Sequence, residues 1–384
     1  MRIKIKTVSN SSIIYIGRSM LGISSKIFLF PYWLALKIRH FLYDKNIKKG
    51  SIYPVPVICV GNITVGGTGK TPHTEMIIRL LSEKYRVAVL SRGYKRESKG
   101  FRIAQVTDTY KEVGDEPLQI KQKFPHITVA VCKSRREGIE KLLALPQAAA
   151  HLQDACRPEL IILDDGFQHR KVKPAHSVVL VNYSRPIVGD NLLPIGLLRD
   201  LPEQIRRADS VIISKSPIAV YADGIMDQYR TAEVVLQQEQ KWRGEMKLSA
   251  QQKLYFSEIR YGSPLAVFYG EGDSRYIYSK TAIFFTGIAN DMEFRNNLVA
   301  NYKVLDSLKF ADHKNFSRAD VRKINSWAKK HPTAAIFTTE KDSKRLVSVK
   351  GLDKNVISRL FYIPIEVAIF PDAKEAEFVG SLNL

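Results

Sequence analysis

The sequence has 384 residues, a formal net charge of +21 and a hydrophobic content of 45%. Its length suits two domains with a sizeable core, and its apolar content excludes an intrinsically disordered protein. The three cysteines are odd in number and show no metal-ligand spacing. We therefore expect unpaired thiols in a reducing compartment, at Cys59, Cys132 and Cys156.

The excess positive charge is concentrated at the start of the chain. Residues 1–50 contain ten Lys or Arg and a single acid, which leaves a net charge of +9. Residues 27–36 read IFLFPYWLAL, which is too short to span a bilayer and is interrupted by a proline. We expect residues 20–49 to lie in a membrane interface; the alternative is a helix packed on the protein's own core. No nucleic-acid recognition module appears, so no nucleic-acid partner is expected.

Residues 54–85 are the stretch around which the rest of the chain is organised. The apolar run PVPVICV leads into the loop GNITVGGTGKT and then into an amphipathic stretch that suits a helix. Strand, glycine-rich loop and helix in this order form a phosphate cradle of backbone N–H groups and a helix N-terminus. The residues predicted to hold ATP are Thr64, Val65, Gly66, Gly67, Thr68, Gly69, Lys70 and Thr71.

Two residues of this loop have specific predicted roles. Lys70 can reach the β- and γ-phosphates, and the hydroxyl of Thr71 can bind Mg²⁺. The loop departs from the usual P-loop pattern because Thr64 replaces its first glycine, and Val65 stands where some dimeric ATPases have a lysine. The alternative is an ordinary glycine-rich turn, which the flanking strand and helix disfavour.

Short apolar runs alternate with longer segments through the first half of the chain. This pattern predicts a parallel sheet covered on both faces, with polar residues gathered where the strands end. The predicted strands are residues 86–90, 127–131, 160–163, 178–181 and 211–213, and a helix is expected at 136–145.

The composition changes near residue 216, which predicts a domain boundary there. We expect a membrane-associating segment at 1–50, a P-loop domain at 51–217 and a smaller C-terminal α/β domain at 218–384. A helix in the smaller domain should begin at Ser317, because Asp320 is placed close to a capping-box position. The strand-like runs of this domain are residues 282–285, 304–310 and 334–338.

Residues 160–165, LIILDD, have the form of a Walker B strand, in which apolar residues lead to a carboxylate near the metal. Adjacent strand residues point to opposite faces, so Asp164 and Asp165 should have different roles. One would hold Mg²⁺, and the other would orient side chains or accept hydrogen bonds. The alternative is a pair of acids that caps a turn.

A kinase that phosphorylates a hydroxyl needs a carboxylate near that hydroxyl, and Asp115 and the two acids of the Walker B strand are the candidates. Asp115 is expected in a loop. His313 closes an apolar run, where a lone histidine is more often a structural group than a catalyst. Arg136 and Arg199 could bind an anionic substrate, although most arginines are solvated ion-pair partners.

The sequence resembles the lipid A 4'-kinases, the tetraacyldisaccharide 4'-kinases of Gram-negative bacteria. The shared motifs occur in order from about residue 15 to residue 346, and the loop combined with DDGFQH is highly specific. The motifs are LYDK (42–45), VGN through the proline of the loop (60–72), SRGY (91–94), GDEP (114–117), LDDGFQH (163–169), LLP (192–194), DH (312–313) and TTEKD (338–342).

The resemblance implies a P-loop kinase-like sheet flanked by helices, a smaller α/β domain joined by a β-ribbon, and an N-terminal membrane-interface helix. It implies MgATP-dependent phosphorylation of the 4'-hydroxyl of an acylated disaccharide 1-phosphate, giving lipid IVA, at the cytoplasmic face of the bacterial inner membrane. The implied roles are catalytic for Asp115, His313 and Asp165, metal-binding for Thr71, Asp165 and Gln168, and substrate-binding for Asp164, His169 and Arg199.

The sequence departs from the family pattern in two places. Asp190 and Asn191 stand where the family often has Gly-Arg, so a substrate-facing arginine is missing there. Asp200 stands where a glutamate is common, which leaves its role open. Two other functions fit parts of the pattern: a dimeric switch-type P-loop ATPase, which would hydrolyse ATP without lipid, and a nucleotide-gated membrane-binding module, which would transfer nothing.

Overall fold

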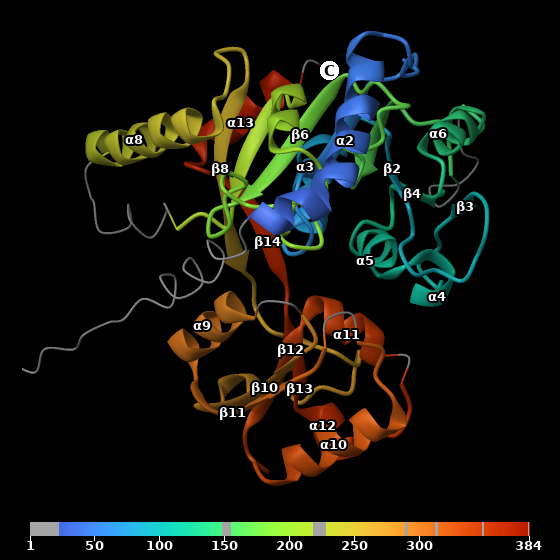
Figure 1. Ribbon diagram of the computed structural model, residues 1–384. Helices are drawn as coiled ribbons and strands as arrows, with labels where there is room; N and C mark the ends of the chain where they lie inside the picture. Colours follow the sequence, from blue (N-terminus) through green and yellow to red (C-terminus); the bar gives the residue numbers. More distant parts are fainter. Residues whose placement is uncertain are drawn as a thin grey trace, which may run out of the picture.

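The computed structural model describes residues 23–147, 155–217, 228–288, 291–311, 314–347, 349–382 and 384. The chain forms a larger and a smaller α/β lobe, each built on its own sheet (Figure 1). Two strands of the larger sheet, β8 (Lys253–Tyr261) and β14 (Ile365–Phe370), run toward the smaller lobe and join the two. The predicted α/β architecture is confirmed.

The larger lobe is built on a nine-stranded sheet in the order β14-β8-β7-β6-β1-β5-β2-β4-β3. The inner neighbours pair in parallel, and the end pairs β14–β8 and β3–β4 are antiparallel. The inner strands are buried almost throughout because helices cover both faces. The remaining strands are β1 (Val57–Asn62), β2 (Val87–Ser91), β3 (Arg102–Ile103), β4 (Thr128–Val131), β5 (Leu160–Asp164), β6 (His176–Asn182) and β7 (Ser210–Ser214).

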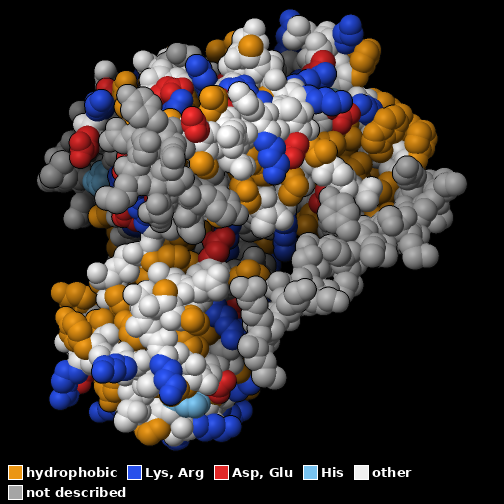
Figure 2. All heavy atoms as spheres, turned by 90° about the vertical axis from the view of Figure 1, so that its left-hand side faces the viewer, with side chains coloured by type: hydrophobic (Ala, Val, Ile, Leu, Met, Phe, Trp, Pro, Cys, Tyr) orange, Lys and Arg blue, Asp and Glu red, His pale blue; other side chains and the backbone are white. Residues whose placement is uncertain are grey.

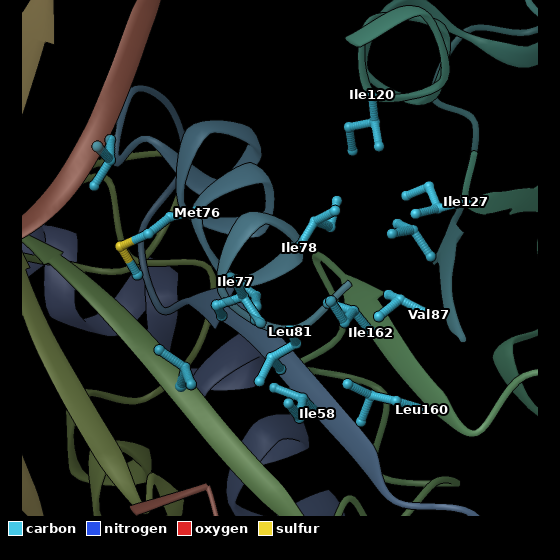
Figure 3. Packing of buried hydrophobic residues seen from close by; sticks show 14 of the residues in the cluster. Ile58, Met76, Ile77, Ile78, Leu81, Val87, Ile120, Ile127, Leu160 and Ile162 are labelled. Carbon is cyan, nitrogen blue, oxygen red and sulfur yellow. The ribbon is translucent and has the colours of Figure 1, made fainter. Parts of the chain in front are cut away.

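The helix after the glycine-rich loop is held by the core of this lobe. On α3 (Lys70–Leu81), Met76, Ile77 and Leu81 belong to one buried cluster with Ile58 of β1 and Leu160 of β5 (Figure 3). Burial of each such side chain contributes roughly 1.5–3 kcal/mol, so this packing fixes the start of α3 beside the loop. The other helices of the lobe are α4 (Tyr110–Val113), α5 (Asp115–Lys123), α6 (Arg135–Leu143), α8 (Gln228–Met246), α13 (Ala373–Ser381) and the 3₁₀ helix Pro202–Arg207.

The smaller lobe has a five-stranded sheet in the order β11-β10-β12-β13-β9. Its helix α10 begins after Ser317, and the Ser317–Asp320 capping box that the sequence predicted is present. The elements are β9 (Leu265–Ala266), β10 (Thr281–Thr286), β11 (Lys303–Lys309), β12 (Ala335–Thr339), β13 (Leu360–Ile363), α9 (Met292–Asn301), α10 (Arg318–Lys329), α11 (Glu340–Leu346), α12 (Lys354–Ser358) and the 3₁₀ helix Ser274–Tyr278.

The smaller lobe begins later and ends earlier in the sequence than the predicted C-terminal domain at 218–384. Strands β8 and β14 belong to the larger sheet, and α13 packs on its core, so the smaller lobe spans about residues 262–364. Helix α8 also belongs to the larger lobe, because Trp242 and Met246 lie in one of its buried clusters. The polar composition of residues 228–246 is that of a helix with one buried side.

The predicted membrane-interface segment contains a helix, α2 (Ile23–Asp44), with Pro31 inside it. Leu29, Leu36 and His40 are buried against the larger lobe. Other large apolar side chains of this helix remain exposed, namely Phe30, Tyr32, Trp33, Leu34, Ile38 and Phe41. Within the described ranges, no helix is long and apolar enough to cross a membrane.

Candidate active site

The glycine-rich loop joins β1 to α3 at the carboxyl end of the sheet's central strand. Gly66 and Gly69 have φ angles of 78° and 82°, in the left-handed region that favours glycine. Gly61 permits a close approach, because a Cβ there would lie 2.5 Å from the Cβ of Phe167. The side-chain amide of Asn62 donates to the hydroxyl of Thr68 over 2.7 Å, which ties the two ends of the loop together.

The segment from residue 190 to residue 199 braces the same loop. Val65 N–H donates to the carbonyl of Leu197 over 2.7 Å, and Arg199 N–H donates to the carbonyl of Ile63 over 2.9 Å. This backbone pairing places the guanidinium of Arg199 over the carboxylate of Asp165, to which it donates from both terminal nitrogens. The structure thus brings Arg199 into the predicted site, where its present partner is a carboxylate of the protein.

Asp165 is held as an anion by three cationic side chains. Burial opposes ionisation, but hydrogen bonds from Arg199 and the charges of Lys70, Arg199 and Arg135 lower the pKa of Asp165 to about 2. The ammonium of Lys70 lies 3.9 Å from the carboxylate. An ionised carboxylate beside the P-loop lysine can bind a cation or accept hydrogen bonds at neutral pH.

Asp164 has the opposite character. It is the last residue of β5, whereas Asp165 was predicted on the same strand but follows it with a φ of 52°. Asp164 is fully buried, and its oxygens lie 3.3 Å from the hydroxyl of Thr74 and 3.4 Å from that of Ser91. Burial, together with the negative charges of Glu116 and Asp165, raises the pKa of Asp164 to about 7. A cation bound nearby would favour the ionised form, so Asp164 is a carboxyl whose charge depends on what occupies the site.

The next residues of the DDGFQH motif are tied to both the loop and the N-terminal helix. The side-chain amide of Gln168 donates to the carbonyl of Asn62 over 2.8 Å, and Arg39 of α2 donates to the carbonyl of Gln168. Burial and the nearby positive charges of Arg135 and Arg92 lower the pKa of His169 to about 4, so its imidazole is neutral at pH 7.

The oxygen donors in this region suit a small, hard cation. Thr71 is the second residue of α3, and Asp164 ends the neighbouring strand β5 with Asp165 directly after it. Their hydroxyl and carboxylate oxygens supply the ligand chemistry that Mg²⁺ prefers. No group of three or more His, Cys, Asp or Glu side chains forms a metal cage within the described residues. Mg²⁺ characteristically binds through one or two carboxylates and substrate phosphates, so the residues present fit that ion.

Asp115 lies at the junction of the two lobes, next to Glu116, whose charge acts on Asp164. It was predicted in a loop, but it is the first residue of α5, after Gly114 with a φ of 95°. Its carboxylate Oδ2 accepts hydrogen bonds from Nε of Arg345 over 3.1 Å and from Nη2 over 2.5 Å. The predicted partner of Asp115, His313, lies outside the described residues.

Arg136 is not brought to the site. It lies on the outer side of α6 with 60% of its side chain exposed, and it pairs with Glu140 one turn along the same helix. Its neighbour Arg135 is buried instead and donates to the carbonyl of Asp164 over 2.8 Å. The basic residue on this helix that supports the site is therefore Arg135.

His73 links the end of the glycine-rich loop to strand β8. This residue was not identified from the sequence. Its Nδ1 lies 2.7 Å from the carbonyl of Gly69, and its Nε2 lies 2.8 Å from the hydroxyl of Ser257 on β8. A carbonyl can only accept, so Nδ1 carries the proton and Nε2 accepts from the hydroxyl. Burial lowers the pKa of His73 to about 4, which keeps this arrangement neutral.

Asp200, whose role the sequence left open, is a structural group. It is fully buried, and its Oδ1 lies 2.6 Å from Nε2 of His40 on α2. Tyr32 of the same helix donates to the carbonyl of Arg199 over 3.0 Å. Helix α2 therefore holds the segment that carries Arg199 through these two hydrogen bonds. Asp190 accepts a hydrogen bond from the N–H of Leu197 and so stabilises the turn of that segment.

This arrangement defines a P-loop nucleotide-binding protein of the kinase type, with a Walker-type loop, an acidic strand beside it and a second lobe over the site. The family model described as tetraacyldisaccharide-1-P 4'-kinase matches residues 25–382. A tetraacyldisaccharide 4'-kinase of Parabacteroides distasonis is 40% identical over 91% of this chain and 91% of its own length. One of Porphyromonas gingivalis is 38% identical over 91% of this chain and 93% of its own length.

A crystal structure of LpxK from Aquifex aeolicus in complex with ATP has a TM-score of 0.67 and 27% sequence identity, covering 94% of this chain and 98% of that one. The chain belongs to the tetraacyldisaccharide 4'-kinase family, and it is an ATP-binding kinase of lipid A biosynthesis. The switch-type ATPase and the membrane-binding module are not favoured by these similarities.

Proposed function

We propose that this chain transfers the γ-phosphoryl group of MgATP to the 4'-hydroxyl of an acylated disaccharide 1-phosphate. The observation that carries this proposal is the conjunction of the P-loop and the neighbouring carboxylates Asp164 and Asp165 with a third carboxylate, Asp115, at the lobe junction. The family names of the relatives supply the acceptor class, which the side chains alone do not specify.

The residues at the phosphate end bind and neutralise charge. Lys70 and the N–H groups of the glycine-rich loop would hold the β- and γ-phosphates, with Arg199 within reach once it releases Asp165. Thr71 and Asp165 would hold Mg²⁺, with Asp164 and Gln168 orienting the ligands. Held there, Mg²⁺ would supply positive charge that offsets the negative charge developing during transfer.

The residues at the acceptor end prepare the hydroxyl. Asp115 would accept the proton of the 4'-hydroxyl as it attacks, and His313 would stabilise the resulting charge. A small cavity at this point is lined by Tyr94, Tyr110 and Asp115 from the larger lobe and by Asn315 from the smaller one. Closing the lobes over the acceptor would exclude water from the transfer.

The outward side of α2 fits a role in holding the enzyme at a lipid surface. Phe30 and Trp33 stack on each other in the exposed part of this helix, and Lys37 lies over the Trp33 ring. Aromatic side chains with a lysine nearby suit the boundary between headgroups and acyl chains. We place the protein as a peripheral or monotopic enzyme at the cytoplasmic face of the inner membrane, where its acylated substrate would reside.

The test is incubation with radiolabelled ATP, with and without a detergent-dispersed tetraacyl disaccharide 1-phosphate. Label should move to the lipid only when MgATP and acceptor are both present. Release of free phosphate without the lipid would support the switch-type ATPase instead. Binding of vesicles and nucleotide without any turnover would support the membrane-binding module.

A further inference from the structure

The contact between Asp115 and Arg345 joins the two lobes at the acceptor end. Asp115 begins α5 in the larger lobe, and Arg345 lies on α11 in the smaller one. Helix α11 packs against α5, and a second ion pair between Lys341 and Glu116 spans 3.7 Å beside it. Figure 2 shows the narrowing between the two lobes from the opposite side of the molecule.

The side chain of Arg345 is also fixed by contacts within the smaller lobe. It is only 1% exposed, and its Nη1 donates to Oδ1 of Asp342 over 3.3 Å. The other oxygen of Asp342 accepts from the N–H of Gly287 over 2.8 Å and from the hydroxyl of Thr339 over 2.7 Å. The guanidinium is therefore anchored in the smaller lobe by a fully buried carboxylate.

The geometry at Asp115 is specific. Nε and Nη2 of Arg345 both donate to the same oxygen, Oδ2, so the arginine fixes the rotation of the carboxylate about its side chain. A buried arginine that only stabilised the smaller lobe would bond within that lobe. Arg359 does this: it is fully buried and donates to the carbonyls of Ala328, His331 and Ala334.

We infer that Arg345 is a positioning residue for the phosphoryl-transfer reaction: the smaller lobe uses it to hold Asp115 in the orientation that faces the acceptor hydroxyl. The inference rests on the proposed role of Asp115. It makes the orientation of the base depend on docking of the lobes, since Arg345 and Asp115 come from opposite sides of the junction. A misplacement of about 1 Å in a reacting group can cost roughly 10²-fold in rate.

The test compares Arg345→Met, Arg345→Lys and the control Arg359→Met in the full chain with MgATP and dispersed acceptor. We expect Arg345→Met to lower kcat roughly 10²-fold with little change in KM for ATP. The kcat of Arg345→Lys should lie between those of the wild type and Arg345→Met, because a lysine keeps the charge but cannot donate from two nitrogens to Asp115. Arg359→Met should lower Tm while its folded fraction keeps the wild-type kcat.

Background variants separate failure of this inference from failure of the proposed function. In an Asp115→Asn background, Arg345→Met should cause no further loss, because the group that it positions is already disabled. The inference would be overturned if Arg345→Met and Arg359→Met had equal kcat. It would also be overturned if the kcat losses of Arg345→Met and Asp115→Asn multiplied in the double variant. Either result would leave Asp115 as the base. An Asp115→Asn enzyme with wild-type kcat would overturn both assignments. If Arg345→Met does not fold, a wild-type kcat in Arg345→Lys overturns the inference.

Discussion

The two ends of the site are built differently. At the phosphate end, Lys70 and Arg199 come from neighbouring segments of the larger lobe, and each contacts Asp165. At the acceptor end, Asp115 of the larger lobe meets Arg345 of the smaller lobe. On the proposed function, the nucleotide site is complete within the larger lobe, whereas the acceptor site is complete only where the lobes meet. ATP could then bind before the enzyme is committed to transfer.

The largest expected effect comes from breaking the phosphate end at its lysine. Lys70→Ala should lower kcat by about 10³-fold or more, because the residue stabilises charge that develops on the transferred group. The measurement is acceptor-dependent transfer from radiolabelled ATP. Lys141→Ala is the matched control, since Lys141 is an exposed lysine paired with Glu137 on α6. Wild-type turnover in Lys70→Ala would refute the assignment of the loop.

The buried His73 beside the glycine-rich loop should make the free energy of unfolding depend on pH. The folded pKa of His73 is about 4, below the unfolded value, so the unfolded state binds a proton that the folded state does not. Stability should therefore fall as the pH drops from about 6.5 toward 4, by about 3 kcal/mol from this group. His73→Gln should flatten that part of the profile in denaturant melts.

His126→Gln is the control for this experiment, because His126 is exposed on the larger lobe. Its profile should follow that of the wild type between pH 7 and pH 4. An unchanged slope in His73→Gln would mean that this histidine does not carry the effect.

A smaller effect is expected where the loop touches the DDGFQH motif. Gly61→Ala would place a Cβ 2.5 Å from the Cβ of Phe167, which forces the two segments apart and should cost about 1–3 kcal/mol of stability. Gly244→Ala is the control, because a Cβ there meets nothing within 4 Å and α8 is an ordinary helix. The control should be neutral or more stable by about 0.5–1 kcal/mol, measured by thermal unfolding.

The smallest expected effect concerns delivery of the acceptor. Serine at Phe30, Trp33 and Phe41 should weaken binding to anionic vesicles about tenfold without a loss of stability, because these side chains are exposed on α2. Leu36→Ala is the contrast: Leu36 is buried, so its loss should lower Tm. Flotation with vesicles is the measurement, and unchanged flotation of the triple variant would remove α2 from the membrane contact.

Local sequence signals reveal the phosphate end better than the acceptor end. The glycine-rich loop and the LIILDD strand each occupy one continuous stretch with a characteristic spacing, so their position in the sheet is predictable. The Ser317 cap is predictable for the same reason. The sequence does not reveal Arg345 or His73, because their partners lie 230 and 184 residues away and depend on how the elements pack.

The helical position of Asp115 and the domain boundary are also not predictable from local sequence. Gly114 starts a short helix at Asp115 in a stretch with loop-like composition. Strand β14 returns to the larger sheet after the whole smaller lobe has been completed, and no local pattern marks this return. Asn62 is the exception among the missed residues, since its place between an apolar strand and the loop could have flagged it.

The central claim is that a carboxylate of one lobe and a group of the other act as a unit on the acceptor hydroxyl. The direct measurement is a double-mutant cycle on kcat with Asp115→Ala and His313→Ala. Each single variant should lower kcat by about 10² or more with little change in KM for ATP, and the double variant should be little worse than the poorer single one. Two losses that multiply, or a His313→Ala enzyme with lower Tm and wild-type kcat, would contradict the account.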